Sequence, residues 1–267
     1  MISHLKNRKF FIKEVLKEVS HYLSKKNNYK SKYTYKKGYL LDADILTHDF
    51  ICSAIQEHFP KDLIFSEEDE KSFSKKINND SFLWMIDPIC GSANYIKGFP
   101  FYVHAVSVFD KNGVLFSGIY HPNCDDLFLA DRNETTLNDK VVSVSNVKRL
   151  DEALVSINCN QADWERENNN LSKIVNLFSP PVTRRLHILE SANLEMAYVA
   201  CGRLDAYINP DDKVWDIAAG SLMISSAGGD THLLNGELFP FSKENIGVIA
   251  ANNYLMGAIR NVFNSAH

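Results

Sequence analysis

Apolar residues recur at helical spacing in two stretches near the start of the chain. In residues 9–24 they fall on one face with lysines between them: Phe10, Phe11, Val15, Leu16, Val19 and Leu23. This spacing predicts an amphipathic helix that packs on a core, and its basic face is too modest to favour a membrane-surface helix. A second helix is predicted from about Thr47 to Phe59, where Pro60 ends it. The polar segment Lys25–Lys37 between them predicts an exposed loop.

The pattern changes after Asp62 to short apolar runs that are typical of β-strands. The predicted strands cover residues 62–66, 82–86, 101–109, 114–120, 126–130 and 140–144. Between the third and fourth runs, Asp110-Lys-Asn-Gly113 supplies turn residues that favour a hairpin. The first half of the chain is therefore predicted to form two helices followed by a mainly antiparallel sheet.

Strands and helices alternate in the rest of the chain. Strands are predicted over residues 153–158, 186–189, 205–209 and 246–250, and helices over 161–178, 192–201 and 216–227. Such alternation is typical of an α/β layer. A weak boundary near residues 145–152 divides the chain into two predicted domains. These are an N-terminal α+β half, residues 1–148, and a C-terminal α/β half, residues 149–267.

Composition narrows the class of protein. The 267 residues are 45% hydrophobic and 23% charged, which is ordinary for a soluble globular protein. The net charge of −4 argues against binding a nucleic-acid polymer through a broad basic field. No stretch reaches the ~20 apolar residues of a membrane span. The five cysteines are scattered without C-x-x-C spacing, and no apolar run follows Lys6–Lys9, which together favour reduced thiols in a cytoplasmic protein.

Three acidic features stand at the ends of predicted strands or the start of a predicted helix. They are Glu67-Glu68, the turn Asp87-Pro-Ile-Cys-Gly-Ser92, and Asp216 after Val214-Trp215. Taken singly, each has an ordinary explanation as a solvated charge, a turn or a helix N-cap. Brought together, their carboxylate and carbonyl oxygens are the ligands that Mg²⁺ takes in proteins. The backbone N–H groups around Gly91, at the start of a helix, would suit a phosphate.

The same segments resemble the inositol monophosphatase family in order and spacing. Trp84–Pro100 resembles the first family signature, W-x-[IL]-D-P-[IL]-D-G-[ST]-x-N-[FY]-x-x-G-x-P, and Trp215–Gly229 is similar to the second, W-D-x-A-[AG]-x(9)-A-G-G in outline. Asp44-Ile-Leu-Thr47, Ser66-Glu-Glu68 and Gly202-Arg-Leu-Asp-Ala-Tyr207 are similar to its D-[LV]-V-T, G-E-E and G-x-x-D-A-Y motifs. Two long ordered signatures in one chain are a specific signal.

The resemblance implies a layered αβαβα sandwich of the inositol monophosphatase and fructose-1,6-bisphosphatase type. It also implies a metal-dependent phosphomonoesterase that uses Mg²⁺ or Mn²⁺ and is often a homodimer. The metal site would lie in the N-terminal half, and the C-terminal half would complete the active site. Lithium sensitivity is expected as well, altered by any change at the second metal position.

The resemblance further implies a role for individual residues. The metal ligands would be Glu68, Asp87, the Ile89 carbonyl and Asp216, with Asp87 bridging two metal ions. Ser92 and Glu68 would orient and deprotonate the attacking water, so the catalytic set is Glu68, Asp87, Ser92 and Asp216. The N–H groups of Gly91 and Ser92 would hold the phosphate, and the substrate-binding residues would be Cys90, Ser191, Ala192 and Asn209.

Cys90 departs from the family pattern, because it stands where the family has an aspartate that binds the second metal. A thiol is a poor ligand for Mg²⁺, and losing one contact worth ~3–4 kcal/mol in the transition state would slow the reaction by ~10²–10³. A nucleophilic role for Cys90 is a further alternative. It is disfavoured because the arginine that cysteine phosphatases need six residues on is Ile96.

Other departures concern the substrate. Asn209 stands where relatives acting on inositol phosphate carry a glutamate, and Glu190 replaces a glycine before Ser191. The substrate is therefore expected to be a small polar phosphate ester, of a sugar, cyclitol, nucleotide or amino alcohol. Two functions stay open: an active phosphomonoesterase, or a catalytically weak or inactive relative that binds phosphorylated ligands, to which Cys90 points.

Overall fold

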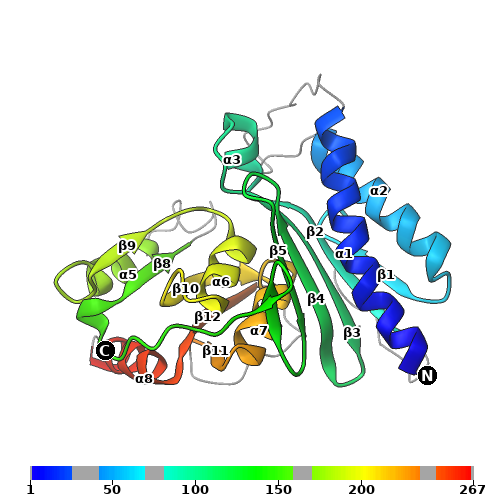
Figure 1. Cartoon of the computed structure of the whole chain (residues 1–267). Helices are drawn as coiled ribbons and strands as arrows, with labels where there is room; N and C mark the ends of the chain where they lie inside the picture. The colour runs from blue at the N-terminus through cyan, green and yellow to red at the C-terminus, as the bar shows by residue number, and fades with distance from the viewer. Residues whose placement is uncertain (1, 26–41, 70–80, 159–169, 235–244, 266–267) are drawn as a thin grey trace.

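Two β-sheets alternate with three layers of helices in the computed structural model, which describes residues 2–25, 42–69, 81–158, 170–234 and 245–265 (Figure 1). Helices α1 (Ile2–Lys25) and α2 (Asp42–His58) form one outer layer, and α5 (Asn170–Phe178) and α8 (Asn253–Ser265) form the other. Helices α6 (Ala192–Ala200) and α7 (Val214–Ser226) lie between the sheets. The predicted αβαβα sandwich is confirmed.

The first sheet follows the order of the chain. Its seven strands are β1 (Leu63–Ser66), β2 (Leu83–Cys90), β3 (Val103–Asp110), β4 (Gly113–His121), β5 (Asp126–Asp131), β6 (Thr135–Leu137) and β7 (Lys140–Val141). Only β1 and β2 pair in parallel, and every later neighbour is antiparallel, as the predicted hairpins require. One face packs on α1 and α2 through Ile12, Leu16 and Ile51, because these apolar positions recur at helical spacing.

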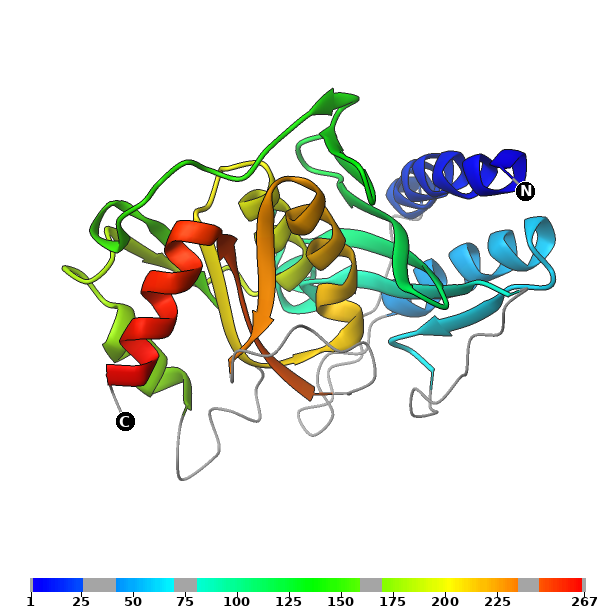
Figure 2. The same ribbon diagram turned by 90° about the horizontal axis from the view of Figure 1, so that it is seen from below.

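The second sheet has the order β11-β12-β10-β8-β9. Its strands are β8 (Leu154–Ile157), β9 (Arg185–His187), β10 (Ala206–Lys213), β11 (Gly229–Leu233) and β12 (Asn245–Asn252). Strand β10 pairs in parallel with β8 and antiparallel with β12. Phe178 of α5 and Leu255 and Ile259 of α8 fill the outer face, which Figure 2 shows from below. This sheet is thus covered on both sides, as a mixed sheet with apolar strands needs to be.

The two central helices approach each other closely. A Cβ atom at Gly220 of α7 would lie only 2.4 Å from the Cβ of Met196 in α6, so only glycine permits this contact. Apolar side chains of both helices, among them Leu194, Ile217 and Met223, pack with Met85 and Phe128 of the first sheet in one core. The beginnings of α6 and α7 are thereby held beside the end of β2.

Some boundaries differ from the sequence prediction. Helix α2 begins at Asp42 rather than Thr47, and β7 ends at Val141 rather than residue 144. Strands β6 and β11 and helix α8 were not predicted, although Leu255, Met256, Ile259, Val262 and Phe263 have helical spacing in α8. Residues 26–37 of the predicted loop and 161–169 of the predicted helix lie outside the described residues.

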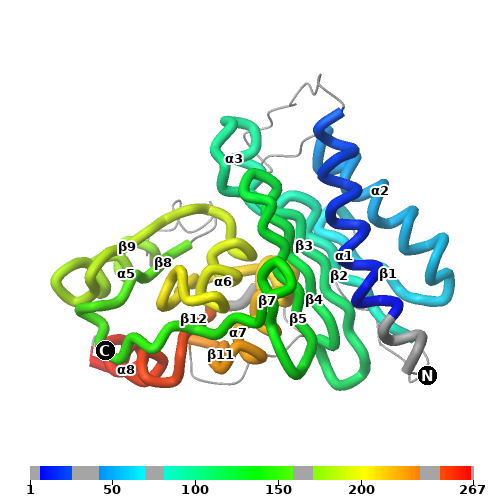
Figure 3. The backbone as a smooth tube through the Cα atoms, in the orientation of Figure 1, coloured from blue at the N-terminus to red at the C-terminus, as the bar shows by residue number. Residues whose placement is uncertain are grey.

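The chain crosses from the first sheet to the second after β7, as the tube in Figure 3 shows. The crossing leads into a short 3₁₀ helix, Leu150–Glu152. A division into independent domains at residue 148 stays a prediction. Among the described residues, none of the helices has the length and apolar character needed to cross a membrane.

Candidate active site

Acidic side chains from separate segments of the chain meet at the end of β2. One ligand atom each from Asp87, Cys90 and Asp216 lies within 4.8 Å of the others. Asp87 and Cys90 belong to β2, and Asp216 belongs to the first turn of α7. The close packing of α7 on the first sheet therefore joins two positions that are 129 residues apart in the sequence. We call Glu67, Asp87 and Asp216 the carboxylate cluster.

Glu67 joins this cluster from the end of β1. Parallel pairing places Ser66 opposite Ile86, and the Glu67 N–H donates to the Ile86 carbonyl at 3.0 Å, so Glu67 lies beside Asp87. Although part of the Glu67 side chain is exposed, its carboxyl group is desolvated and faces the charges of Asp87 and Asp216, which raises its pKa well above the ordinary value.

Glu68, the predicted ligand, stands one residue farther along and is half-buried. Only desolvation raises its pKa, and no carboxylate of the cluster contributes. The structure thus brings Glu67, rather than Glu68, against Asp87. Asp44 of α2 also faces Glu67 closely enough to raise its pKa, and it accepts a long hydrogen bond, 3.4 Å, from the Ser92 hydroxyl.

Asp87 is the centre of the cluster and is only 1% exposed. Its Oδ2 accepts a hydrogen bond of 2.8 Å from the side-chain amide of Asn193, which also donates to the Trp215 carbonyl at 3.2 Å. Its Oδ1 is buried without a hydrogen-bond partner among the described residues. Burial and the nearby charge of Asp216 raise the pKa of Asp87 well above its ordinary value, despite the Asn193 hydrogen bond.

Asp216 has two roles at the start of α7. Its Oδ2 accepts the Lys213 backbone N–H at 3.2 Å, so it closes a capping box from the third position of α7, and the N-cap residue is Lys213 rather than Asp216. Its carboxyl group also faces the cluster, and desolvation raises its pKa to about 6 against the partial opposing effect of Lys213. One carboxylate thus orders the helix end and contributes to the site.

These carboxyl groups fit a hard divalent cation. Asp87 Oδ1 is a buried acceptor that lacks a donor, which native structures avoid unless another group satisfies it. Burial raises the pKa values of Glu67, Asp87 and Asp216, and neighbouring carboxylates raise those of Glu67 and Asp87 further. A bound cation would favour the ionised forms instead. Oxygen donors in this number suit Mg²⁺, whereas the Cys90 thiol does not.

Cys90 is 5% exposed, and both its backbone carbonyl and its thiol accept a hydrogen bond from the start of α6. Its carbonyl accepts the Ser191 hydroxyl at 2.8 Å, and its Sγ accepts the Asn193 N–H at 3.4 Å. Burial and the negative charges of Asp87 and Asp216 raise the pKa of this thiol well above its ordinary value. Cys90 is therefore neutral at physiological pH, which disfavours the nucleophile alternative because the thiolate is the reactive form.

The turn after β2 needs glycine at position 91. Gly91 has φ +99°, and a Cβ atom there would lie 2.8 Å from the Phe101 carbonyl oxygen. The half-buried Ser92 begins α3 (Ser92–Lys97), and its hydroxyl donates to the Ile89 carbonyl at 2.9 Å. The predicted phosphate-binding residues thus lie in one tight turn beside the carboxylate cluster, and the Ile89 carbonyl already accepts one hydrogen bond.

The predicted substrate-binding residues lie in two places. Ser191 and Ala192, both buried, begin α6 directly beside Cys90 and Gly91. Asn209 is buried in β10, where its amide donates to Asp212 at 2.5 Å and to the Tyr207 hydroxyl at 3.1 Å. Burial and the charge of Asp216 raise the pKa of Asp212 well above its ordinary value, so this network adjoins the cluster through Asp212.

Glu190 has φ +55°, in the left-handed region that favours glycine. Its carbonyl oxygen would lie 3.3 Å from a Cβ at Gly91, so the strained residue packs on the turn. The glycine that the family pattern has at this position therefore has a conformational reason, and this chain keeps the same backbone shape with a larger residue.

The sequence analysis did not assign a role to three residues that lie at the site, Asp44, Glu67 and Asn193. Asp44 and Glu67 stand inside motifs that were noticed, so a signal for them was present. Asn193 stands in an apolar helix with no local signal, and only the packing of α6 on β2 shows its contact with Asp87.

Comparisons with known proteins identify the family of the chain. The model of the inositol monophosphatase family matches residues 4–266. Nus factor SuhB of Xylella fastidiosa is 31% identical over 195 residues, which cover 73% of this chain and 68% of the relative. Inositol-1-monophosphatase of Bacillus subtilis is 31% identical over 211 residues, covering 77% and 76%.

A crystal structure of an IMPase/NADP phosphatase complexed with Mg²⁺ and phosphate has the same fold, with a TM-score of 0.85 and 21% identity over 98% of this chain and 96% of that one. The family match includes both signature segments, and the two relatives match over about three quarters of the chain. The chain therefore belongs to the inositol monophosphatase family, which consists of Mg²⁺-dependent phosphomonoesterases.

Proposed function

We propose that this metal-dependent phosphomonoesterase holds its catalytic cation between Glu67, Asp87 and Asp216 and hydrolyses an ester of a small polar alcohol there. The observation that carries the proposal is the buried Asp87 Oδ1, which has no hydrogen-bond partner among the described residues; Asp87 also offers, with Cys90 and Asp216, ligand atoms that lie within 4.8 Å of one another. Glu67 takes the place that the sequence assigned to Glu68, because its carboxyl group faces Asp87.

When bound, Mg²⁺ supplies the positive charge that a phosphate dianion needs beside carboxylates, and it acidifies water. Asp87 and Asp216 provide oxygen ligands from a strand end and a helix start, two rigid elements. The Asn193 amide occupies Asp87 Oδ2, so it fixes the plane of the carboxyl group and leaves Oδ1 directed at the cluster. Asn193 is thus a positioning residue.

The turn residues bind the phosphate and place the water. The backbone N–H groups of Gly91 and Ser92 are proposed to donate to phosphate oxygens, since the absence of a Cβ at Gly91 allows close approach. The Ser92 hydroxyl, which already contacts the Ile89 carbonyl and Asp44, lies at the edge of the cluster and can orient water. Glu67, which lies beside Asp87 and faces Asp44, is proposed to accept the proton of that water.

The substrate class is proposed from the residues around the turn. Ser191, Ala192 and Cys90 lie beside this turn. Asn209 has a neutral amide where relatives acting on inositol phosphate carry a glutamate. An ester of a sugar, cyclitol, nucleotide or amino alcohol is compatible with these groups, and inositol phosphate has no special support. Use of Mn²⁺, a homodimer and a cytoplasmic location stay predictions.

A second candidate function is binding of phosphorylated ligands with slow or no hydrolysis. It is favoured by Cys90, a neutral thiol at a position within 4.8 Å of Asp87 and Asp216 where a carboxylate would bind a cation. Under this alternative the fold and the phosphate turn are retained, while leaving-group stabilisation is weak.

A phosphate-release screen separates the two. Wild type, Asp87→Asn and Cys90→Asp are assayed with sugar, cyclitol, nucleotide and amino-alcohol monophosphates in Mg²⁺ or Mn²⁺. Asp205→Asn is the control, because Asp205 is also a buried acceptor of a backbone N–H, from Leu154 at 2.7 Å, but lies outside the cluster. Release by wild type and Asp205→Asn, abolished in Asp87→Asn, supports the enzyme. Release only by Cys90→Asp would establish the binding function instead.

A further inference from the structure

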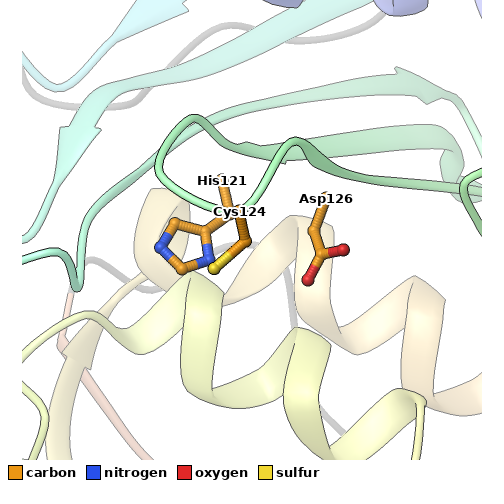
Figure 4. Close-up of side chains that lie close together, drawn as sticks. All are labelled: His121, Cys124 and Asp126. Atoms are coloured by element: carbon orange, nitrogen blue, oxygen red, sulfur yellow. The ribbon is translucent and has the colours of Figure 1, made fainter.

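A second group of potential metal ligands lies at the turn between β4 and β5, and it shares no residue with the carboxylate cluster. It consists of His121, Cys124 and Asp126, whose ligand atoms all lie within 4.8 Å of one another. Figure 4 shows the three side chains on one side of the turn, with the Cys124 sulfur beside the His121 ring. Among the described contacts, no hydrogen bond joins the three side chains to one another.

The His121 ring is held in the tautomer that a metal ligand needs. Its Nε2 lies 2.6 Å from the Pro100 carbonyl oxygen, and because a carbonyl can only accept, Nε2 carries the hydrogen. In the neutral ring the lone pair is then on Nδ1, which receives only a long contact of 3.4 Å from the Tyr198 hydroxyl. A backbone carbonyl that orients the far nitrogen of a histidine is the common arrangement around bound metals. His121 is 1% exposed, so its ring has little freedom to turn.

The backbone fixes the spacing of the three residues. His121 and Asp126 face each other as the last pair of the β4–β5 ladder. Between them the Cys124 N–H donates to the His121 carbonyl at 3.3 Å, and Asp125 takes the left-handed conformation with φ +52°. Cys124 is exposed, so an ion can reach the thiol from solvent while the other two ligands are buried.

Asp126 retains capacity to bind an ion although it is paired. Its Oδ2 accepts Arg203 Nη1 at 2.5 Å, and its Oδ1 receives a long contact of 3.4 Å from the Asn138 amide. An ionised carboxylate has about four lone-pair sites, so these two contacts leave acceptor sites on both oxygens. Arg203 also keeps the carboxylate in a fixed position, since Asp126 is only 7% exposed.

We propose that His121 Nδ1, Cys124 Sγ and a carboxylate oxygen of Asp126 bind a borderline divalent cation of the Zn²⁺ type. Nitrogen, sulfur and oxygen donors together suit Zn²⁺ or Co²⁺, whereas Mg²⁺ rejects the thiol. On binding, the Cys124 S–H bond is replaced by a sulfur–metal bond, and its proton goes to solvent. Water fills the fourth position. The ion would join the end of β4 to the start of β5 through these three side chains.

Cobalt tests the proposal, because its thiolate complexes absorb by charge transfer. The full chain is titrated with Co²⁺ in excess Mg²⁺, which fills the carboxylate cluster with an ion that does not bind thiols. Wild type is expected to develop the band with one equivalent of Co²⁺, and Cys124→Ser is expected to lose it. Single changes of Cys52, Cys90, Cys159 and Cys201 to serine are the matched controls and should keep it. Cys90→Ser is the most informative control, because Cys90 lies near Asp87 and Asp216 and could itself bind Co²⁺ through its thiol.

Two further readouts confirm or reject the same site. Zn²⁺ should protect Cys124 from alkylation, mapped by peptide mass, and Zn²⁺ binding should release a proton in wild type that Cys124→Ser does not release. Cys124 is exposed in a turn, so the serine variant is expected to fold, which its thermal unfolding checks. A wild type with no band, a band that survives in Cys124→Ser, or a band lost in Cys90→Ser would each overturn the proposal.

Discussion

Replacing Asp216 by asparagine should stabilise the metal-free protein while it weakens metal binding and catalysis. The asparagine Oδ1 can still accept the Lys213 N–H, which Asp216 accepts at 3.2 Å, so the start of α7 keeps its cap. What the change removes is one negative charge from the carboxylate cluster. Asp216 also raises the pKa values of Glu67 and Asp87, so its neutralisation relieves repulsion on both.

The magnitude follows from the pKa of Asp216, which desolvation raises from 3.8 to about 6. Two pKa units correspond to ~3 kcal/mol, and partial exposure of the side chain reduces this to roughly 1–2 kcal/mol. Because the folded pKa lies above the unfolded one, the folded state holds the proton more tightly, and ionisation weakens the fold as pH rises from about 4 to 6. Asparagine cannot ionise, so it escapes this loss.

Thermal unfolding measures the effect in EDTA and in excess Mg²⁺, at pH 4 and at pH 7.5. In EDTA at pH 7.5 the variant should melt a few degrees higher than wild type, since 1 kcal/mol shifts the Tm of a chain of this size by roughly 2–4 °C. At pH 4 the difference should nearly vanish. Mg²⁺ should raise the Tm of wild type more than that of the variant, because binding to the folded state stabilises it by mass action. Asp205→Asn is again the control.

Two results would refute the reasoning. If Asp216→Asn melts below wild type in EDTA at pH 7.5, the carboxylate is a net stabiliser and the crowding argument is wrong. If Mg²⁺ raises the Tm of both proteins equally, Asp216 is not a ligand. Phosphate release by the variant should fall together with the Tm increase that Mg²⁺ causes. If the variant releases phosphate although Mg²⁺ no longer raises its Tm, the role of Asp216 in metal binding is separate from its role in catalysis.

Four further predictions concern the same region. Cys90→Asp should bind Mg²⁺ more tightly but melt lower in EDTA. The Cys90 ligand atom lies within 4.8 Å of those of Asp87 and Asp216, and two charges at that separation repel by about 3 kcal/mol at an effective dielectric of 20. Calorimetric titration and thermal melting check this. Glu190→Gly should raise the free energy of unfolding by about 1 kcal/mol in denaturant titration, because φ +55° favours glycine. Gly91→Ala should abolish phosphate release and lower stability by ~1–3 kcal/mol, because its Cβ would meet the Phe101 carbonyl at 2.8 Å. Burial raises the pKa of Glu195 to about 7, so stability should fall by up to roughly 3 kcal/mol between pH 4.5 and 7, and Glu195→Gln should flatten that profile.

The individual helices and strands could be predicted from the sequence because they depend on local patterns, whereas the layered sandwich and the residues of the site were expected only from the resemblance to the family. Helical spacing in α1 and α2 and short apolar runs in β2 to β5 are set by which face is buried. The spacing within Asp87-Pro-Ile-Cys-Gly-Ser92 marks a turn that needs glycine at Gly91, where φ is indeed +99°. These features do not require knowledge of distant contacts.

The choice between Glu67 and Glu68 could not be made from the sequence for a physical reason. Side-chain direction alternates along a strand, so a shift of one residue in the strand end exchanges the two glutamates. Strand β1 ends at Ser66, and its parallel register with β2 decides which glutamate lies beside Asp87. A strand of four residues carries no sequence pattern that would show where β1 ends or how it pairs with β2.

Asn193 and the turn ligands needed tertiary structure for a different reason. Asn193 lies 106 residues after Asp87, and its hydrogen bond exists because Gly220 lets α6 and α7 pack closely beside β2. His121, Cys124 and Asp126 are near in sequence but face one another only because the β4–β5 ladder ends at the pair His121 and Asp126.

Cys90 and Asn193 have opposite effects on the negative charge around Asp87. The Cys90 thiol is neutral because burial and two carboxylates oppose its ionisation, so it leaves less negative charge available to a cation. The Asn193 amide donates to Asp87 Oδ2 and favours the ionised form of that carboxyl group. The three remaining carboxylates still provide the hard oxygen ligands that Mg²⁺ requires. We therefore expect fewer cation contacts at this site than in the family pattern, and a rate that depends on how well Glu67, Asp87 and Asp216 alone hold the ion.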